Sequence, residues 1–454
     1  MTFIPEIEAT IGNLLGNKDP GLRYHSAWWL GKMKIKEAVP ALCQCLTDET
    51  DRTALGGYPL RRQAARSLGM IKEKEAIQPL LESLQCSDPR LKEASILALK
   101  AIGDSQAKPG LIQFLKNDTN NKPYEALIET LAALEAWSIS DWIKPSLQDP
   151  SERIKGAAAV YFFCQTRDEH YLQLLLDNLK HHNPFIRQSS AFDLAQCKKP
   201  ALSSIICEAD LPNNVKLAVL KQILESYIID QSNSCGDGSD CTVKSLLHAL
   251  DLLIPNAIEG NLPPAASRDS IELVDPFSKD QIDEILSMLT HSNPLDKCRA
   301  IQLLVAVGVS DVNIIIDALE TSDDQDIRAG LVQVIYELKD PQSITALQQV
   351  IGLEVANHCQ GKLRRVATLT LGNIYSKANL EEDKVSIINT LNWTLNEPDD
   401  WGLRYSAVMA WEEILSEHPS LAKPFSHLSA EHEEPVIRQR IDYALMHLQT
   451  HVDE

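Results

Sequence analysis

The feature that most constrains this chain is a short segment that returns along its whole length. In each copy an aspartate, asparagine or glutamate precedes a basic residue by four positions, and an apolar stretch, often rich in alanine, follows. Clear copies run Asp19–Arg23, Asp88–Lys92, Asp149–Arg153, Asn183–Arg187, Asn293–Lys297, Asp324–Arg328, Asp400–Arg404 and Glu434–Arg438, and weaker copies centre on Arg61, Glu125, Lys216 and Arg364. Self-similarity of this kind is the sequence signature of a fold that stacks one unit many times.

The spacing of the copies fits a pair of helices. Adjacent basic positions lie 31 residues apart from Arg61 to Lys92 and 34 residues apart from Arg404 to Arg438. Two helices of about three turns with short connections fill that length. The acidic or amide side chain is expected to cap the second helix, whose first position tolerates proline. A closing glycine, such as Gly31 or Gly69, is expected to end that helix in the left-handed conformation.

One helix pair cannot bury its apolar face alone, whereas stacked pairs can. We therefore predict an all-α fold, a superhelical α-solenoid that resembles HEAT-type repeats. The repeat lapses between about residues 231 and 275, where polar, glycine- and proline-containing segments are typical of a linker. The sequence thus predicts two solenoid domains, residues 1–270 and 271–454.

The charge balance narrows the possible partners. The chain carries 63 acidic and 43 basic side chains, a formal net charge of −20, which argues against general binding to nucleic acid or to anionic membranes. No apolar run is long enough to span a bilayer, and the first residues lack the basic segment of a signal peptide, so we expect a cytoplasmic protein. The ten cysteines form no pair of CxxC units, so no metal site is expected.

Three intervals are longer than the rest. The basic positions lie 38 residues apart from Arg23 to Arg61, 36 apart from Arg328 to Arg364 and 40 apart from Arg364 to Arg404. The extra residues sit at about 48–58 and 354–360, and such insertions gather on the face of a solenoid that binds.

Aromatic and basic residues concentrate around the first of these insertions. Tyr24, Trp28 and Trp29 precede it, and Tyr58, Arg61 and Arg62 follow. They are either large core fillers of a terminal repeat or a flat aromatic surface with nearby guanidinium groups. The second arrangement suits a planar conjugated ligand that carries carboxylates.

Two further clusters lie in the C-terminal half. Asn357-His358-Cys359-Gln360-Gly361 precedes Arg364, and histidine with a neighbouring thiol is suited to proton transfer near neutral pH. Asp400-Trp401-Gly402-Leu403-Arg404-Tyr405 parallels Gly21-Leu22-Arg23-Tyr24. For Asp400–Tyr405, core packing and helix capping explain the residues about as well as ligand contact does, and a structural role is also open to the neighbouring histidine and cysteine.

The residues around Arg23, Trp28, Trp29 and Gly56-Gly57-Tyr58-Pro59-Leu60-Arg61-Arg62 resemble the E-type subunit of the E/F class of phycobilin lyases. Asp400–Ala407 is similar to the F-type subunit, and residues 357–361 resemble an Asn-His-Cys-Gln-Gly-Asn motif of lyase-isomerases in that class. Here the sixth position is Lys362. The resemblance implies E and F parts fused in one chain.

It also implies an activity: attachment of an open-chain tetrapyrrole, phycoerythrobilin or phycocyanobilin, to a cysteine of an apo-phycobiliprotein α-subunit. The bilin is a substrate, and no cofactor is expected. Trp28, Trp29, Tyr58 and Trp401 would hold the tetrapyrrole plane, Arg61, Arg62 or Arg364 its propionates, and Asp51 its pyrrole N–H groups. His358 and Cys359 would relay protons in an isomerisation to phycourobilin. Tyr24, Gln360 and Arg404 complete the predicted binding residues.

Two alternatives stay open beside an isomerising lyase that acts on the α-subunit of phycocyanin. One is a lyase without isomerase activity that acts on the α-subunit of phycoerythrin. The other is a non-catalytic scaffold, because acidic HEAT solenoids commonly serve as adaptors.

Overall fold

The computed structural model describes residues 7–117, 122–232, 240–255, 278–352, 361–397, 400–422, 425, 432 and 434–452. Every regular element in these residues is helical, which confirms the all-α solenoid. The chain divides into two compact units, residues 1–199 and 200–454. This division differs from the predicted boundary at 270, which falls on residues outside the described part and stays a prediction for the E and F parts.

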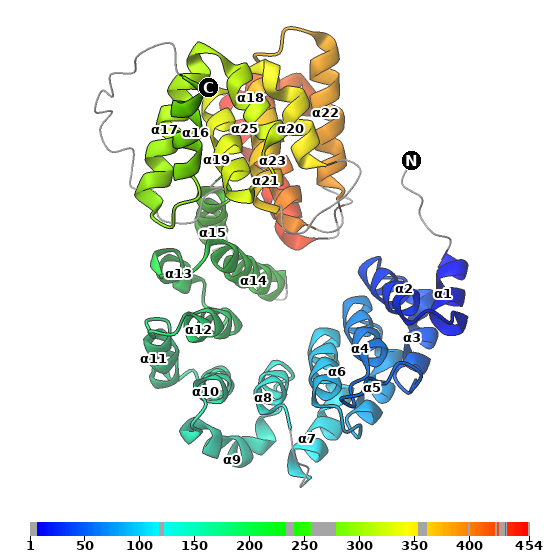
Figure 1. The fold of residues 1–454 in the computed structure, drawn as a ribbon. Coiled ribbons are helices and arrows are strands. Elements are labelled where there is room, and N and C mark those ends of the chain that lie inside the picture. Colours follow the sequence, from blue (N-terminus) through cyan, green and yellow to red (C-terminus); the bar gives the residue numbers. More distant parts are fainter. Residues whose placement is uncertain are drawn as a thin grey trace. The chain divides into compact units, whose positions relative to one another are not determined.

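The N-terminal unit alternates helices between two rows (Figure 1). A first row contains α2 (Pro20–Lys32), α4 (Pro59–Ile71), α6 (Pro89–Ile102), α8 (Tyr124–Ala133), α10 (Glu152–Thr166) and α12 (Pro184–Gln196). A second row contains α3 (Val39–Cys45), α5 (Ile77–Ser83), α7 (Lys108–Lys116), α9 (Ser140–Ile143) and α11 (Glu169–Asn178), and α1 (Ile7–Gly16) precedes both. Neighbours within the first row contact each other directly. We call the side of this row turned away from the second row the first-row face.

The C-terminal unit continues the pairing. Its α-helices are α13 (Ser203–Glu208), α14 (Asn213–Ser232), α15 (Asp240–Leu253), α16 (Lys279–Met288), α17 (Pro294–Ser310), α18 (Val312–Thr321), α19 (Gln325–Leu338), α20 (Ile344–Ile351), α21 (Gly361–Tyr375), α22 (Glu381–Leu395), α23 (Trp401–Glu417) and α25 (Pro435–Val452). Within this unit α14 packs against α25, so helices before residue 256 contact the last helices of the chain.

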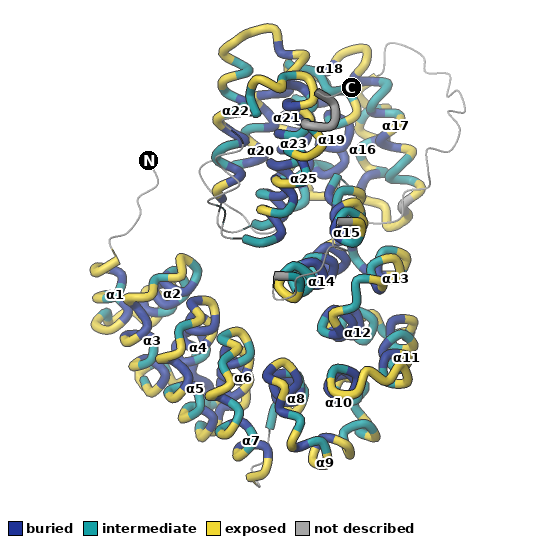
Figure 2. The backbone as a smooth tube through the Cα atoms, turned by 180° about the vertical axis from the view of Figure 1, so that it is seen from behind, coloured by how far each residue is buried: buried dark blue, intermediate teal, exposed yellow. Residues whose placement is uncertain are grey.

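Short 3-10 turns connect many of the pairs. They are η1 (Lys36–Ala38), η2 (Lys74–Ala76), η3 (Ser105–Ala107), η4 (Trp137–Ile139), η5 (Lys144–Gln148), η6 (Pro200–Leu202), η7 (Pro341–Ser343) and η9 (Pro419–Leu421). Figure 2 shows that helices in both units are buried along the sides that meet their neighbours and exposed along the sides that do not.

The acidic or amide residue of the repeat caps a helix as predicted. Asp19 accepts a hydrogen bond from the Gly21 amide at 2.8 Å, and Asp400 accepts one from the Gly402 amide at 2.9 Å. The same cap occurs at Asp88, Asn183, Asn293 and Asp324. One copy differs: Asp149 accepts from the Ser151 amide, and α10 begins after Ser151 instead of directly after the aspartate.

In many copies the basic residue of the repeat ties a helix pair together. Arg23 Nε donates to the Leu14 carbonyl at 2.8 Å, and Arg364 Nε donates to the Ile351 carbonyl at 2.7 Å. Arg61, Arg187, Lys216, Arg328 and Arg404 likewise donate to carbonyls at or just beyond the end of the preceding helix. The last carbonyls of a helix lack partners within it, so a cation placed there satisfies them and favours the negative end of the helix dipole.

The prediction for the closing glycines is wrong at Gly31 and Gly69. Both lie inside their helices and neither has a positive φ. A Cβ on Gly31 would stand 2.6 Å from Ser67 Cα, and one on Gly69 would stand 2.9 Å from Ala98 Cα. These glycines therefore allow adjacent first-row helices to touch at the backbone, a demand that the sequence pattern alone does not distinguish from a helix end.

Candidate functional site

The glycine contacts fix the register of the first row. Gly31 faces Ser67 and Gly69 faces Ala98, while Thr130 Oγ1 lies 3.4 Å from the Ile96 carbonyl. On α4, α6 and α8 the contact with the preceding helix of the row is made through Ser67, Ala98 and Thr130. The residues directly before these three are Arg66, Leu97 and Glu129, which therefore lie at the same height along their helices, on the first-row face. Trp28 holds the equivalent place on α2.

Two aromatic residues of α2, Tyr24 and Trp28, lie one turn apart on this face. Trp28 and Trp29 are both half-buried. Trp29 packs against the core, whereas the Lys32 ammonium stands 4.3 Å from the Trp28 ring. Half-buried Tyr24 meets exposed His25 edge-on at 5.9 Å. Both interpretations of the double tryptophan thus hold in part, because one ring fills the core and the other remains partly accessible.

The loop between α3 and α4 is held by the repeat arginines. Arg23 donates to Asp48 and to Thr50, each at 2.6 Å. Burial opposes ionisation of Asp48, but the hydrogen bonds from Arg23 and Thr50 outweigh it and lower the pKa of Asp48 to about 2. Arg61 is buried and donates to the Thr47 carbonyl and to Glu49. The loop is therefore a folded part of the unit.

Glycine is required at each of the two adjacent positions of this loop for a different reason. Gly56 has φ +79°, a conformation that glycine adopts readily. A Cβ on Gly57 would collide with the Arg62 guanidinium. Arg62 in turn forms a bidentate pair with Asp88 at 2.7 and 2.8 Å, and Asp88 also accepts from the Tyr58 amide. The motif thus joins the loop to the start of α6.

Several predicted binding residues are buried or already bonded to other residues of the protein. Tyr58 is 5% exposed, with the Arg61 guanidinium 4.0 Å from its ring. One oxygen of Asp51 accepts from the Leu60 amide, and the other is buried without a hydrogen-bond partner among the described residues. Arg364 is 3% exposed and pairs with Glu397, while Arg404 pairs with Glu434. Arg61, Arg364 and Arg404 thus already have partners within the protein.

The first-row face carries a guanidinium that sequence reasoning missed. Arg66 is exposed, and among the described residues it has no hydrogen-bond or ion-pair partner. It stands one helix away from Trp28 at the same level. The signal was present in the sequence, because Arg66 follows Arg61 by the interval that separates Trp28 from Arg23.

The remaining predicted residues belong to the C-terminal unit. Half-buried Trp401 begins α23 and lies 5.5 Å from the Lys221 ammonium, measured to the ring centre. Arg365 pairs with Asp400 at 2.7 Å, as Arg62 does with Asp88. His358, Cys359 and Gln360 lie outside the described residues, as does the second predicted insertion.

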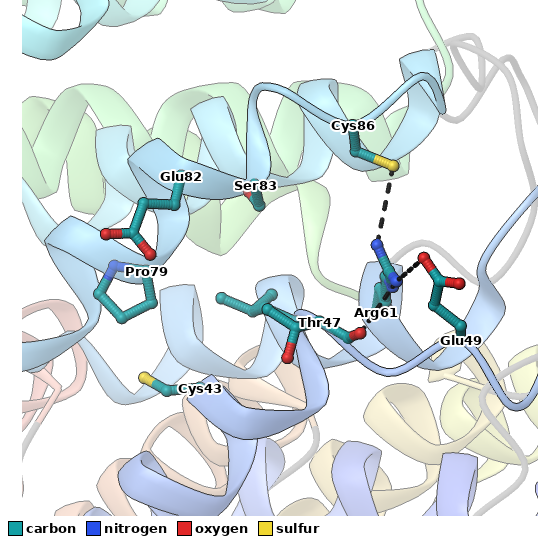
Figure 3. Close-up of a pocket in the computed structure, with 9 residues that line it drawn as sticks. Cys43, Thr47, Glu49, Arg61, Pro79, Glu82, Ser83 and Cys86 are labelled. Carbon is teal, nitrogen blue, oxygen red and sulfur yellow. Dashed lines mark hydrogen bonds and ion pairs between the residues drawn. The ribbon is translucent and has the colours of Figure 1, made fainter.

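A pocket of about 410 Å³ lies between α3, α5 and the loop after α3 (Figure 3). Cys43, Glu49, Arg61, Glu82 and Cys86 are among its lining residues. The Arg61 guanidinium is already paired with Glu49, so the remaining charge of the wall is acidic. A ligand with carboxylates is repelled by such a wall, and the first-row face suits it better.

Comparison with known proteins identifies the family of this chain. Residues 58–132 match the family described as HEAT repeats, and residues 22–48 match the PBS lyase HEAT-like repeat. The bilin biosynthesis protein PecE of Mastigocladus laminosus is 42% identical over 247 residues, which cover 54% of this chain and 91% of that protein. The chain belongs to the E/F-type phycobilin lyase family.

Two further relatives extend the match. The phycocyanobilin lyase subunit alpha of a Picosynechococcus strain is 36% identical over 235 residues, covering 49% of this chain and 88% of that subunit. The bilin biosynthesis protein PecF of a Nostoc strain is 34% identical over 169 residues, covering 37% of this chain and 96% of that protein.

Two kinds of feature are absent from the described residues of this family member. Among these residues, no helix is long and apolar enough to cross a bilayer. In the same part of the chain, no group of three or more histidine, cysteine, aspartate or glutamate side chains is placed to hold a metal ion.

Proposed function

We propose that this chain is a phycobilin lyase-isomerase in which E-type and F-type parts are fused. It attaches phycoerythrobilin through a thioether to a cysteine of a phycobiliprotein α-subunit, that of phycocyanin, and isomerises the bound pigment to phycourobilin. The lyase activity is supported chiefly by the family match, which covers 91% of a bilin biosynthesis protein at 42% identity.

The fusion is supported by matches to two kinds of relative. PecE matches over 54% of the chain and PecF over 37%, so both lengths fit side by side in one polypeptide. The irregular segment near residue 270 is where we place the junction. The acceptor α-subunit and the open-chain tetrapyrrole are the partners of the fused chain, which we expect to work in the cytoplasm.

The first-row face is where we place the pigment. Trp28 offers a partly accessible ring to a flat conjugated system, and Tyr24 and Trp29 flank it on the same helix. Arg66 is an exposed guanidinium without a partner among the described residues, which suits it to pair with a propionate. Holding the reactants in register supplies on the order of 7–11 kcal/mol in well-oriented reactions.

His358 and Cys359 are our candidates for the isomerisation. Moving a double bond needs a proton added at one carbon and removed from another, and both side chains titrate near neutral pH. Gln360 completes the motif. Lys362 departs from the motif of lyase-isomerases, and this observation favours the second candidate function, attachment without isomerisation.

Co-expression with a phycoerythrobilin pathway and an apo-α-subunit tests the proposal. A covalent adduct with phycourobilin absorbance is expected, and His358→Ala or Cys359→Ser should give the unshifted adduct. An unshifted adduct from the wild type would leave a simple lyase. Absence of any covalent pigment, with α-subunits of phycocyanin and phycoerythrin both offered, would leave a scaffold.

A further inference from the structure

The C-terminal unit carries a groove that the proposed function does not use. It has a volume of about 440 Å³ and lies between α16 and α18, with Ile327 of α19 beside it. We call it the α16–α18 groove. It opens to solvent, so a second molecule can reach its lining side chains.

Both helices present the same pattern to the α16–α18 groove. From α16 come Lys279, Ile282, Asp283 and Leu286. From α18 come Ile314, Asp317, Ala318 and Thr321. In each helix these are positions i, i+3, i+4 and i+7, which lie on one face. The groove thus follows about two turns of each helix, as a groove that receives a third helix does.

The floor of the groove is aliphatic. Ile282, Leu286, Ile314, Ala318 and Ile327 are all half-buried, so each leaves part of its side chain in contact with water. Removal of apolar carbon from water is the main source of free energy in helix docking. This floor therefore suits the aliphatic side chains of a partner.

The rim of the groove is acidic on both helices. Asp283 and Asp317 are exposed, and neither carboxylate has an ion-pair or hydrogen-bond partner among the described residues. Asp280, Glu284 and Glu320 are further exposed acids of the same two helices. Lys279 is the one basic residue in the sequence of α16 and α18. The rim therefore attracts cations.

This charge narrows the choice of occupant. A second copy of the chain would bring its own excess of acids to the rim, because the formal net charge is −20. Anionic lipids, nucleic acid and a pigment with propionates are repelled in the same way. A protein segment that combines aliphatic side chains with lysine and arginine is attracted by the rim and buried by the floor.

We propose that the α16–α18 groove docks a basic amphipathic helix of a partner protein. The aliphatic stripe of that helix rests on the floor, and lysine or arginine side chains beside the stripe pair with Asp283 and Asp317. Exposed ion pairs add little affinity, so the apolar contact supplies most of it and the charges supply selectivity. This docking does not depend on the proposed function.

Fluorescence anisotropy of labelled synthetic peptides with the full chain is the first test. One peptide is a helix of about four turns with leucines on one face and lysine and arginine beside them, and its match has glutamate at every basic position. The basic peptide should bind with a Kd of about 10 µM or tighter, and the acidic one about tenfold more weakly. Salt should narrow the difference. Equal binding of both at low salt, or no binding of the basic peptide, would overturn the inference.

A charge reversal places the interaction on the groove. Asp283→Lys combined with Asp317→Lys changes two exposed positions, so the variant should fold, and it should bind the basic peptide about tenfold more weakly. Glu413→Lys combined with Glu417→Lys changes the net charge equally at exposed positions of α23 and should keep wild-type binding. Equal weakening in both double variants would mean that overall charge attracts the peptide, which contradicts docking in the groove.

Hydrogen exchange and sedimentation complete the test. Backbone amides of α16 and α18 should exchange more slowly when the basic peptide is bound, while those of α22 should not change. Protection confined to other helices would overturn the inference. The chain alone should sediment as a monomer. A dimer that is lost in the Asp283→Lys, Asp317→Lys variant would assign the groove to a second copy and contradict the proposal.

Discussion

The same four residues open a helix in each unit, yet the tyrosine that ends them meets different surroundings. In Gly21–Tyr24 and in Gly402–Tyr405 the arginine donates to a carbonyl at or just beyond the end of the preceding helix. Tyr24 is half-buried on the first-row face. Tyr405 is fully buried and donates to Asp251 at 2.8 Å, a residue of α15.

The difference lies in what the chain supplies next to the helix. In the C-terminal unit α15 brings Asp251 to Tyr405, and Arg440 of α25 contacts Asp251 at 3.1 Å and also Glu412. The local sequence thus sets the arginine anchor in both units, while packing from distant helices decides whether the tyrosine is accessible. One unit keeps an aromatic face, and the other uses the equivalent position to join its first helices to its last.

Among the changes that test this difference between the units, removal of Arg440 should destabilise the protein most. The side chain is almost fully buried between two carboxylates, so Arg440→Ala leaves both without their cation. We expect a loss of about 3–5 kcal/mol in the free energy of unfolding of the C-terminal unit. Urea denaturation checks this, with Arg438→Ala, an exposed neighbour, as control. Equal stability of the two variants would mean that the network does not hold α15 in place.

Each unit has a glycine at which two neighbouring helices touch, and an added methyl group should destabilise both contacts to a similar extent. A Cβ on Gly31 would stand 2.6 Å from Ser67 Cα, and one on Gly372 would stand 2.6 Å from Ala410 Cα. Gly31→Ala and Gly372→Ala should each cost about 1–3 kcal/mol through overpacking. Thermal unfolding measures the loss against Gly12→Ala. A harmless Gly372→Ala would show that the two units do not share this contact.

The tyrosines themselves give a direct contrast. Tyr405→Phe removes the hydrogen bond to half-buried Asp251 and should cost about 1 kcal/mol. Tyr24→Phe should change stability by less than about 0.5 kcal/mol, because no such acceptor faces it on a half-exposed surface among the described residues. Paired denaturation curves measure both. The comparison fails if the order is reversed.

Low pH should destabilise the N-terminal unit through Asp48, in the loop after α3. The pKa of Asp48 is lowered to about 2 in the folded chain, below its unfolded value. Its contribution to stability is therefore complete above about pH 4 and is lost as the pH falls toward 2. Asp48→Asn should remove this part of the acid dependence, which unfolding curves between pH 5 and 2 would reveal as a small change in slope.

Sequence reasoning predicted what local chemistry determines. The helix pairs, the capping aspartates and the period follow from residues within a few positions of one another. The role of Gly31, the carbonyl partners of the repeat arginines and the burial of Tyr58 depend on neighbouring repeats, which one segment does not reveal.

The central claim is that this chain transfers a bilin to a protein thiol. The most direct measurement is the mass of the acceptor's cysteine-containing peptide after purified chain, phycoerythrobilin and apo-α-subunit are mixed. We expect a gain of one bilin on one cysteine, formed much faster than in a mixture without the chain. The same mass gain at the same rate in both mixtures would contradict it.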